Sequence, residues 1–134
     1  MCNDAAFDWL FEGVTEDLFG DYGFSGNGAA GFELDHVDQR NGSPQNHVLL
    51  ARSAGDSSTF MLVPEEQLTH LTNLTGGPEE EAKHADMIYF ELPAGGSVFA
   101  AGSITFCGSP PWNDFKNDVS RLLENYMRNR LMGQ

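Results

Sequence analysis

Residues 85–123 constrain the fold more than any other stretch of the chain. Side chains alternate in character over residues 87–92, which is typical of a β-strand. Gly95 and Gly96 suit a tight turn, and the return run from Ser97 to Phe106 is small and apolar, as in a strand buried against other layers. The sequence therefore predicts a β-hairpin that packs within a larger structure and is not a free-standing module.

A capped helix is predicted after the hairpin. Asn117 and Asp118 are both suitable N-cap residues. Apolar side chains then recur at helical spacing on one face, whereas the charged ones lie largely on other faces. The apolar set is Val119, Leu122, Leu123, Tyr126, Met127 and Leu131. We expect this face to cover a sheet.

The first two thirds of the chain carry weaker signals. Residues 4–14 fit a helix and also a strand, so both remain open. We expect an irregular glycine-rich loop over 20–31, short strands over 47–51 and 59–63, a short turn or helix over 64–71, and an acidic loop over 75–81. Strands, a covering helix and a final hairpin are what the second half of an α/β domain contains. Residues 1–134 are thus expected to form a single, incomplete domain.

Charge and cysteine content exclude several function classes. Lys and Arg number 7 against 20 Asp and Glu, a net charge of -13, which makes nucleic acid a poor partner. Solubility and adaptation to high salt both explain such a surface. No apolar run approaches the roughly 20 residues of a membrane-spanning helix, and no secretory signal precedes Phe7. We therefore expect no membrane partner. Because Cys2 and Cys107 are too few for a disulfide framework, we also expect a cytoplasmic protein.

Motifs along almost the whole chain stand in the order and at roughly the spacing of one known family. In the C-terminal part they are Ala85-Asp86-Met87, Tyr89-Phe90-Glu91, Gly95-Gly96, Gly102-Ser103-Ile104, Cys107-Gly108-Ser109, Asn117 and Val119-Ser120-Arg121. Upstream they include Asp8-Trp9, Phe11-Glu12-Gly13 and Gly28-Ala29-Ala30-Gly31-Phe32-Glu33-Leu34-Asp35. On these residues the chain resembles the C-terminal part of the N,N-dimethylformamidase large (beta) subunit family.

The resemblance implies a fold. It is the C-terminal half of a three-layer α/β domain like that of the class I glutamine amidotransferases, with a final β-hairpin and a C-terminal helix. This fold would serve as a scaffold, without the cysteine chemistry of those enzymes. The first half, upstream of Met1, would supply the central parallel strands.

The resemblance also implies a reaction and its partners. An iron-activated water would attack the carbonyl of a small amide such as N,N-dimethylformamide and release an amine and a carboxylic acid. The family holds this iron with two tyrosines and a glutamate whose matching positions lie upstream of Met1. We therefore expect iron in the full-length enzyme and none bound by this chain alone. The expected partners are the upstream part of the same polypeptide or a separate subunit, a small amide substrate, and a second copy of the chain paired along an uncovered sheet edge.

Glu33 is the candidate catalytic residue. It follows a glycine-rich loop, which lets backbone approach a ligand, and a carboxylate placed there can orient water or act as a base. The structural alternative is an exposed acidic turn that Glu33 shares with Asp35, His36 and Asp38. The resemblance implies that the glutamate of this Gly-Phe-Glu segment lies near the active iron. Asp35 is expected to cap or bond backbone amides.

Two other functions are weighed against amide hydrolysis. One is a non-catalytic assembly domain that keeps the fold. The other is a cysteine hydrolase with Cys107 as nucleophile, which requires a histidine within hydrogen-bond reach. All four histidines precede Cys107, the reverse of the glutamine-amidotransferase order, so we expect Cys107 to be a small buried apolar residue. The tyrosines do not match the iron ligands of the family: Tyr89 is expected to be a strand aromatic and Tyr126 a helix core residue.

Overall fold

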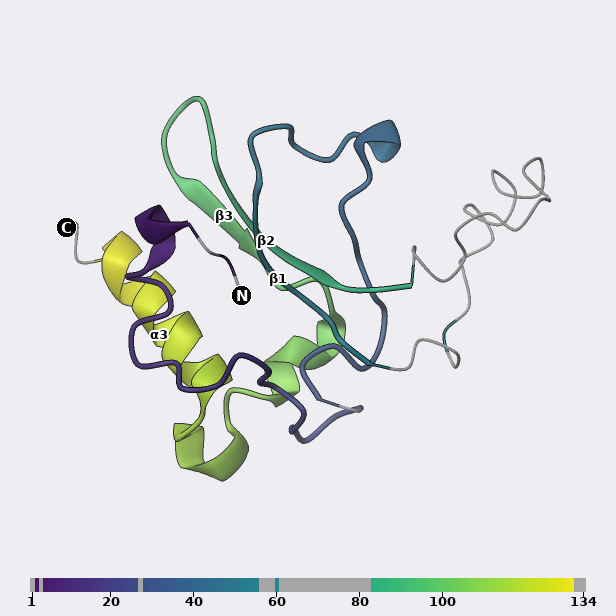
Figure 1. Cartoon of the computed structure of the whole chain (residues 1–134), viewed down its shortest axis with the longest axis vertical. Coiled ribbons are helices and arrows are strands. Elements are labelled where there is room, and N and C mark those ends of the chain that lie inside the picture. Colours follow the sequence, from purple (N-terminus) through teal and green to yellow (C-terminus); the bar gives the residue numbers. More distant parts are fainter. Residues whose placement is uncertain (1, 3, 27, 56–59, 61–82, 132–134) are drawn as a thin grey trace.

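A three-stranded antiparallel sheet and a C-terminal helix form the framework of the molecule (Figure 1). The computed structural model describes residues 2, 4–26, 28–55, 60 and 83–131. The sheet has the order β1-β2-β3, with β1 at Val48–Arg52, β2 at Asp86–Glu91 and β3 at Ser97–Ala100. The helix is α3, Asp118–Leu131. Short 3-10 turns complete the described part: η1 at Ala5–Phe7, η2 at Gln39–Asn41, η4 at Ile104–Gly108 and η5 at Trp112–Phe115.

The predicted hairpin is confirmed, but its second strand is shorter than expected. β2 and β3 pair antiparallel, and Gly95 and Gly96 both have φ near +90°, a conformation that only glycine adopts without strain. β3 ends at Ala100 because Gly102 turns the chain against β2, where a Cβ would lie 2.6 Å from the carbonyl oxygen of Asp86. The small residues after Ala100, which were predicted to continue the strand, therefore form this close turn and the start of η4. β3 itself is half-buried, so the prediction of a fully buried return strand to Phe106 was wrong.

The other predicted elements have mixed outcomes. A strand was predicted over 47–51 and is observed as β1, which pairs antiparallel with β2 across an irregularity between Leu49 and Ala51. Residues 4–14 form neither of the two expected elements; they contain η1 and turns. The described residues within 20–31 contain no helix or strand, as expected. The strand predicted over 59–63, of which only Phe60 is described, the turn over 64–71 and the loop over 75–81 lie outside the described residues.

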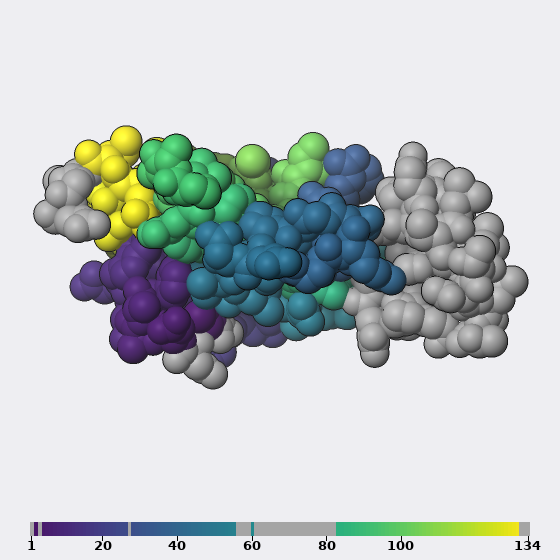
Figure 2. Space-filling model, turned by 90° about the horizontal axis from the view of Figure 1, so that it is seen from above, coloured from purple at the N-terminus to yellow at the C-terminus, as the bar shows by residue number. Residues whose placement is uncertain are grey.

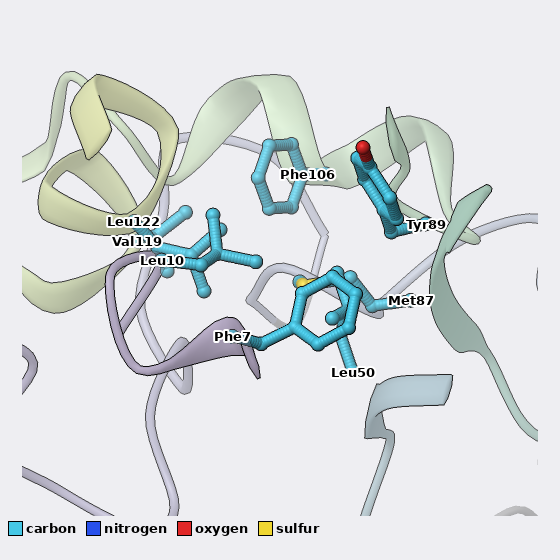
Figure 3. Close-up of a cluster of buried hydrophobic side chains, with 8 residues drawn as sticks. All are labelled: Phe7, Leu10, Leu50, Met87, Tyr89, Phe106, Val119 and Leu122. Carbon is cyan, nitrogen blue, oxygen red and sulfur yellow. The ribbon is translucent and has the colours of Figure 1, made fainter. Parts of the chain in front are cut away.

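The hydrophobic core lies between the sheet, the N-terminal segment and α3. Figure 3 shows its members, which come from the N-terminal segment, β1, β2, η4 and α3: Phe7, Leu10, Leu50, Met87, Tyr89, Phe106, Val119 and Leu122. The N-terminal segment lies beside α3 and the hairpin (Figure 2), and Asn125 fixes it there by donating hydrogen bonds to the carbonyls of Leu10 and Glu12. Tyr89 and Tyr126 thus have their expected structural roles.

The apolar face predicted for the helix is only partly covered. Val119 and Leu122 are buried, whereas Met127 and Leu131 at its far end are exposed. No helix in the described part of the chain is long and apolar enough to cross a membrane.

The carboxylate of Asp86 joins three segments at the start of β2. Its side chain is almost completely buried; it accepts hydrogen bonds from Arg52 Nε at 2.7 Å and Nη2 at 3.1 Å, and from the amide of Val37 at 3.0 Å. His84 Nε2 lies 3.3 Å away. Burial by itself raises the pKa of Asp86, but the hydrogen bonds from Arg52 and Val37 and the nearby His84 outweigh it and hold the pKa below its usual range.

Asp86→Asn is expected to lower the free energy of unfolding by about 2 kcal/mol at pH 7, since it removes the charge that Arg52 and the Val37 amide stabilise. Because the pKa is lower in the folded than in the unfolded chain, this stabilisation is present above the unfolded value of about 4 and is lost as the pH falls through the folded value. Urea unfolding of both proteins at pH 7 and pH 3 measures it. Asp8→Asn, at an exposed carboxylate, is the control. A difference that is equal at both pH values would contradict the assignment.

Candidate functional site

The segment that carries Glu33 is fastened to the connection between β3 and η4. The Gly31 amide donates to Thr105 Oγ1 at 2.7 Å, and Ser103 Oγ donates to the carbonyl of Phe32 at 2.7 Å. Just beyond Glu33, Leu34 forms a β-bridge with Ser103, and the amide of Asp35 donates to Gly102 at 2.8 Å. The backbone is therefore held on both sides of Glu33.

Glu33 itself has an unusual backbone conformation and an exposed side chain. Its φ is +53°, in the left-handed region that residues with a Cβ rarely adopt. Such strained positions persist only where the surroundings impose them, and they are concentrated at functional sites. The arrangement presents a carboxylate outward from a fixed backbone, where a ligand can approach it.

The other members of the predicted acidic cluster have separate structural tasks. Asp38 caps η2: it accepts from the Arg40 amide at 2.8 Å, and its hydrogen bonds with Arg40 lower the pKa of its carboxyl. The His36 ring lies against the His84 ring, with centroids 5.1 Å apart. Asp35 bonds through its backbone, which also accepts from the amide of Asp86, and among the described residues its side chain accepts from no backbone amide. Asp35, His36 and Asp38 therefore have structural roles, and Glu33 remains the candidate for chemistry in this cluster.

No metal-binding cluster forms among residues 2, 4–26, 28–55, 60 and 83–131: no group of three or more His, Cys, Asp and Glu side chains is close enough to share an ion.

Tyr22, the third tyrosine, has a structural position at the start of α3. Its hydroxyl donates to Asn117 Oδ1 and accepts from the Val119 amide, both at 3.3 Å, and burial raises the pKa of its phenol.

Cys107 lies in η4 and is exposed, so the prediction that it is a buried apolar residue was wrong. The turn that replaces the end of the predicted strand places this side chain outward. Within the described part of the chain, no hydrogen bond joins Cys107 to a histidine. The thiol therefore lacks the partner that would generate a nucleophilic thiolate there.

An open hollow of about 640 Å³, which was not predicted from the sequence, lies at the start of α3. Residues 15–24 form one wall and residues 112–118 the other, and Glu33 does not line it. A single signal in the sequence pointed to it: Phe24 and Trp112 are large aromatic residues in turn-rich segments, outside any predicted strand or helix. Nothing in the sequence showed that these two segments meet.

Comparison with known proteins gives a consistent result over the chain. Residues 1–117 match the family described as N,N-dimethylformamidase beta subunit-like, C-terminal. The chain is 38% identical over 125 residues to the N,N-dimethylformamidase beta subunit of Alcaligenes sp, which covers 92% of this chain and 16% of that protein. It is 37% identical over 120 residues to the beta subunit of Paracoccus aminophilus, covering 89% of this chain and again 16% of the relative. The chain therefore spans about a sixth of the length of these relatives.

Proposed function

Since the chain belongs to the N,N-dimethylformamidase beta subunit-like C-terminal family, as its motifs predicted, we propose that it is the C-terminal scaffold unit of an amide hydrolase of the dimethylformamidase type. The observation that carries this proposal is the 38% identity over 92% of the chain to a subunit of such an enzyme. The activity, the small amide substrate and the cytoplasmic location belong to the proposal, because the chain spans only 16% of that relative.

The iron that the resemblance implies is not assigned to this unit. The described residues bring no group of three or more ligand-type side chains together, so they offer no ligand set for a mononuclear iron. Within the proposal, the ligands come from the rest of a longer subunit. The three tyrosines of this chain hold the core and the helix start instead.

Glu33 is the residue of this unit that we propose for the chemistry. As a general base, its carboxylate accepts a proton from the water whose oxygen attacks the amide carbon. The C–N bond then breaks, the leaving nitrogen takes the proton, and a carboxylic acid and an amine result. Exposure of the side chain and the backbone that is held on both sides, with φ at +53°, support this role.

The unit also has the features of one part of a larger fold. Within the described residues β1 and β3 are the outer strands of the sheet, and β3 is only half-buried. We propose that further strands and a further layer of a glutamine-amidotransferase-like three-layer domain cover it in the complete protein. An assembly function without catalysis is the second candidate, and the exposed apolar side chains Leu18, Phe24, Phe32, Ile104 and Phe115 favour it.

The chain alone is expected to contain no stoichiometric iron and to leave N,N-dimethylformamide intact. The reason is that its described residues supply Glu33 but no ligand set for iron. Metal analysis of the purified chain and an assay for released dimethylamine test both expectations. One tightly bound iron per chain, or hydrolysis by the chain alone, would contradict this expectation and show that this unit contains the active site.

Self-association is expected through an outer strand edge of the sheet, because an unpaired strand edge is a template for another strand. With a net charge of -13 the copies repel one another, so added salt should strengthen the association by screening. Light scattering over a range of chain and salt concentrations measures this. A monomer that unfolds cooperatively at high concentration and high salt would show that the edge needs no partner.

A further inference from the structure

The hollow at the start of α3 has two walls that are tied firmly together. Asp118 accepts hydrogen bonds from the amides of Thr15 and Glu16, both at 3.1 Å. Asn117 donates to the carbonyls of Pro110 at 2.9 Å and Trp112 at 2.7 Å. The hollow is therefore built by a network of hydrogen bonds and does not depend on loose packing of two loops.

Large apolar side chains rim this rigid hollow and remain in contact with solvent. Leu18 and Phe24 are each 70% exposed, and Trp112 is 40% exposed. The rings of Phe24 and Trp112 lie 5.2 Å apart and form a continuous apolar rim. Leaving such groups in water is unfavourable, and patches of this kind mark surfaces that bind a partner.

Backbone strain next to this rim also favours a binding surface. Asn113, Asp114 and Phe115 have φ of +52°, +53° and +63°, three successive residues with a Cβ in the left-handed region. Of these three residues Asn113 lines the hollow, whereas Phe115, which is 66% exposed, does not. Strained backbone of this kind is concentrated at functional sites, and Asn113 places it in the wall of the hollow.

The charges around the rim define the chemistry of that partner. Glu16 and Asp21 line the hollow, and neither forms an ion pair with another described residue; Lys116 is the one cation among the described lining residues. The chain as a whole carries a net charge of -13. A second copy would bring the same negative charge to this surface, whereas a basic partner would be attracted to it.

We propose that this hollow binds a polypeptide segment of the longer dimethylformamidase-type subunit that inserts an apolar side chain beside Phe24 and Trp112. Lys or Arg residues flanking that side chain pair with Glu16 and Asp21. That the segment belongs to a dimethylformamidase-type subunit rests on the proposed function. Its apolar and basic character rests on the geometry and charge of the hollow.

Overlapping synthetic peptides that tile the Alcaligenes beta subunit outside its matched C-terminal part provide the probe. They are titrated against the Trp9→Phe chain, in which Trp112 is the only tryptophan and reports on the hollow by its emission. We expect at least one apolar and basic peptide to bind and shift this emission. Its affinity should fall at least about tenfold in Phe24→Ser, and also in the Glu16→Gln, Asp21→Asn double variant, where salt should no longer weaken binding.

Phe32→Ser is the matched control, because Phe32 is exposed but does not line the hollow, and it should leave the affinity unchanged. The proposal is overturned if no peptide binds, if binding is indifferent to Phe24→Ser, or if acidic peptides bind equally well. A shift in emission with chain concentration alone would assign the hollow to a second copy instead. Turnover of Glu33 variants tests the proposed function separately, since Glu33 lies outside the hollow.

Discussion

Glu33→Gln is expected to lower turnover by roughly a hundredfold or more in an amide hydrolase that carries this unit, the usual worth of a positioned general base. Glutamine keeps the shape of the side chain but cannot accept the proton of the attacking water. Iron content and melting temperature should barely change, because the side chain of Glu33 is exposed and forms no hydrogen bond or ion pair with another described residue. Steady-state kinetics with N,N-dimethylformamide, together with metal analysis and thermal unfolding, measure the three quantities.

Two further variants make the Glu33 result specific. Asp35→Asn removes an exposed carboxylate from the same segment and should leave turnover nearly normal. Glu33→Gly should lose activity like the glutamine variant without losing stability, because glycine adopts a φ of +53° without steric cost. Near-normal turnover of Glu33→Gln would reduce Glu33 to an acidic loop residue. Loss of iron or of the fold would make its role structural.

Asn117→Ala is expected to cost about 3 kcal/mol of unfolding free energy, because one side chain serves as both helix cap and loop clamp. Its Oδ1 accepts from the Ser120 amide at 2.9 Å and thus caps α3. Its Nδ2 donates to the carbonyls of Pro110 and Trp112, which hold the wall of the hollow. Denaturation by urea, followed by circular dichroism, measures the loss.

The two tasks of Asn117 can be separated. Asn117→Asp keeps the capping oxygen but removes the donor, so it should recover about 1 kcal/mol of the loss. Asn46→Ala removes a side chain whose one hydrogen bond within the described part of the chain goes to the carbonyl of Glu91, and it should cost less than about 1 kcal/mol. If Asn117→Asp is as stable as the wild type, the clamp contributes nothing and only the cap matters.

The elements that the sequence predicted correctly are those with strong local signals. Gly95 and Gly96 between alternating residues sufficed for the hairpin, and Asn117 before an apolar stripe sufficed for α3 and its cap. The return strand was overestimated because its length depends on Gly102 packing against Asp86, a contact between separate segments. For the same reason the exposure of Cys107 could not be foreseen.

The candidate site was accessible to sequence reasoning only in part. The glycine-rich segment and the family motifs singled out Glu33, but its left-handed backbone is imposed by Ser103 and Gly102, far along the chain. The hollow joins Thr15 and Glu16 to Asp118, and no local pattern records such a pairing. Helical and strand periodicities describe single elements, whereas this surface exists only where two irregular segments meet.

The contacts between the N-terminal segment and α3 have a consequence for biosynthesis. Leu10 and Glu12 are fastened by Asn125, and Thr15 and Glu16 by Asp118, so residues 10–16 pack against a helix that is translated more than a hundred residues later. These contacts cannot form until α3 has left the ribosome, and such distant pairings are slow to close. Phe7 can pack on Tyr89 earlier, but the core around Leu10 is completed only when Val119 and Leu122 of α3 become available.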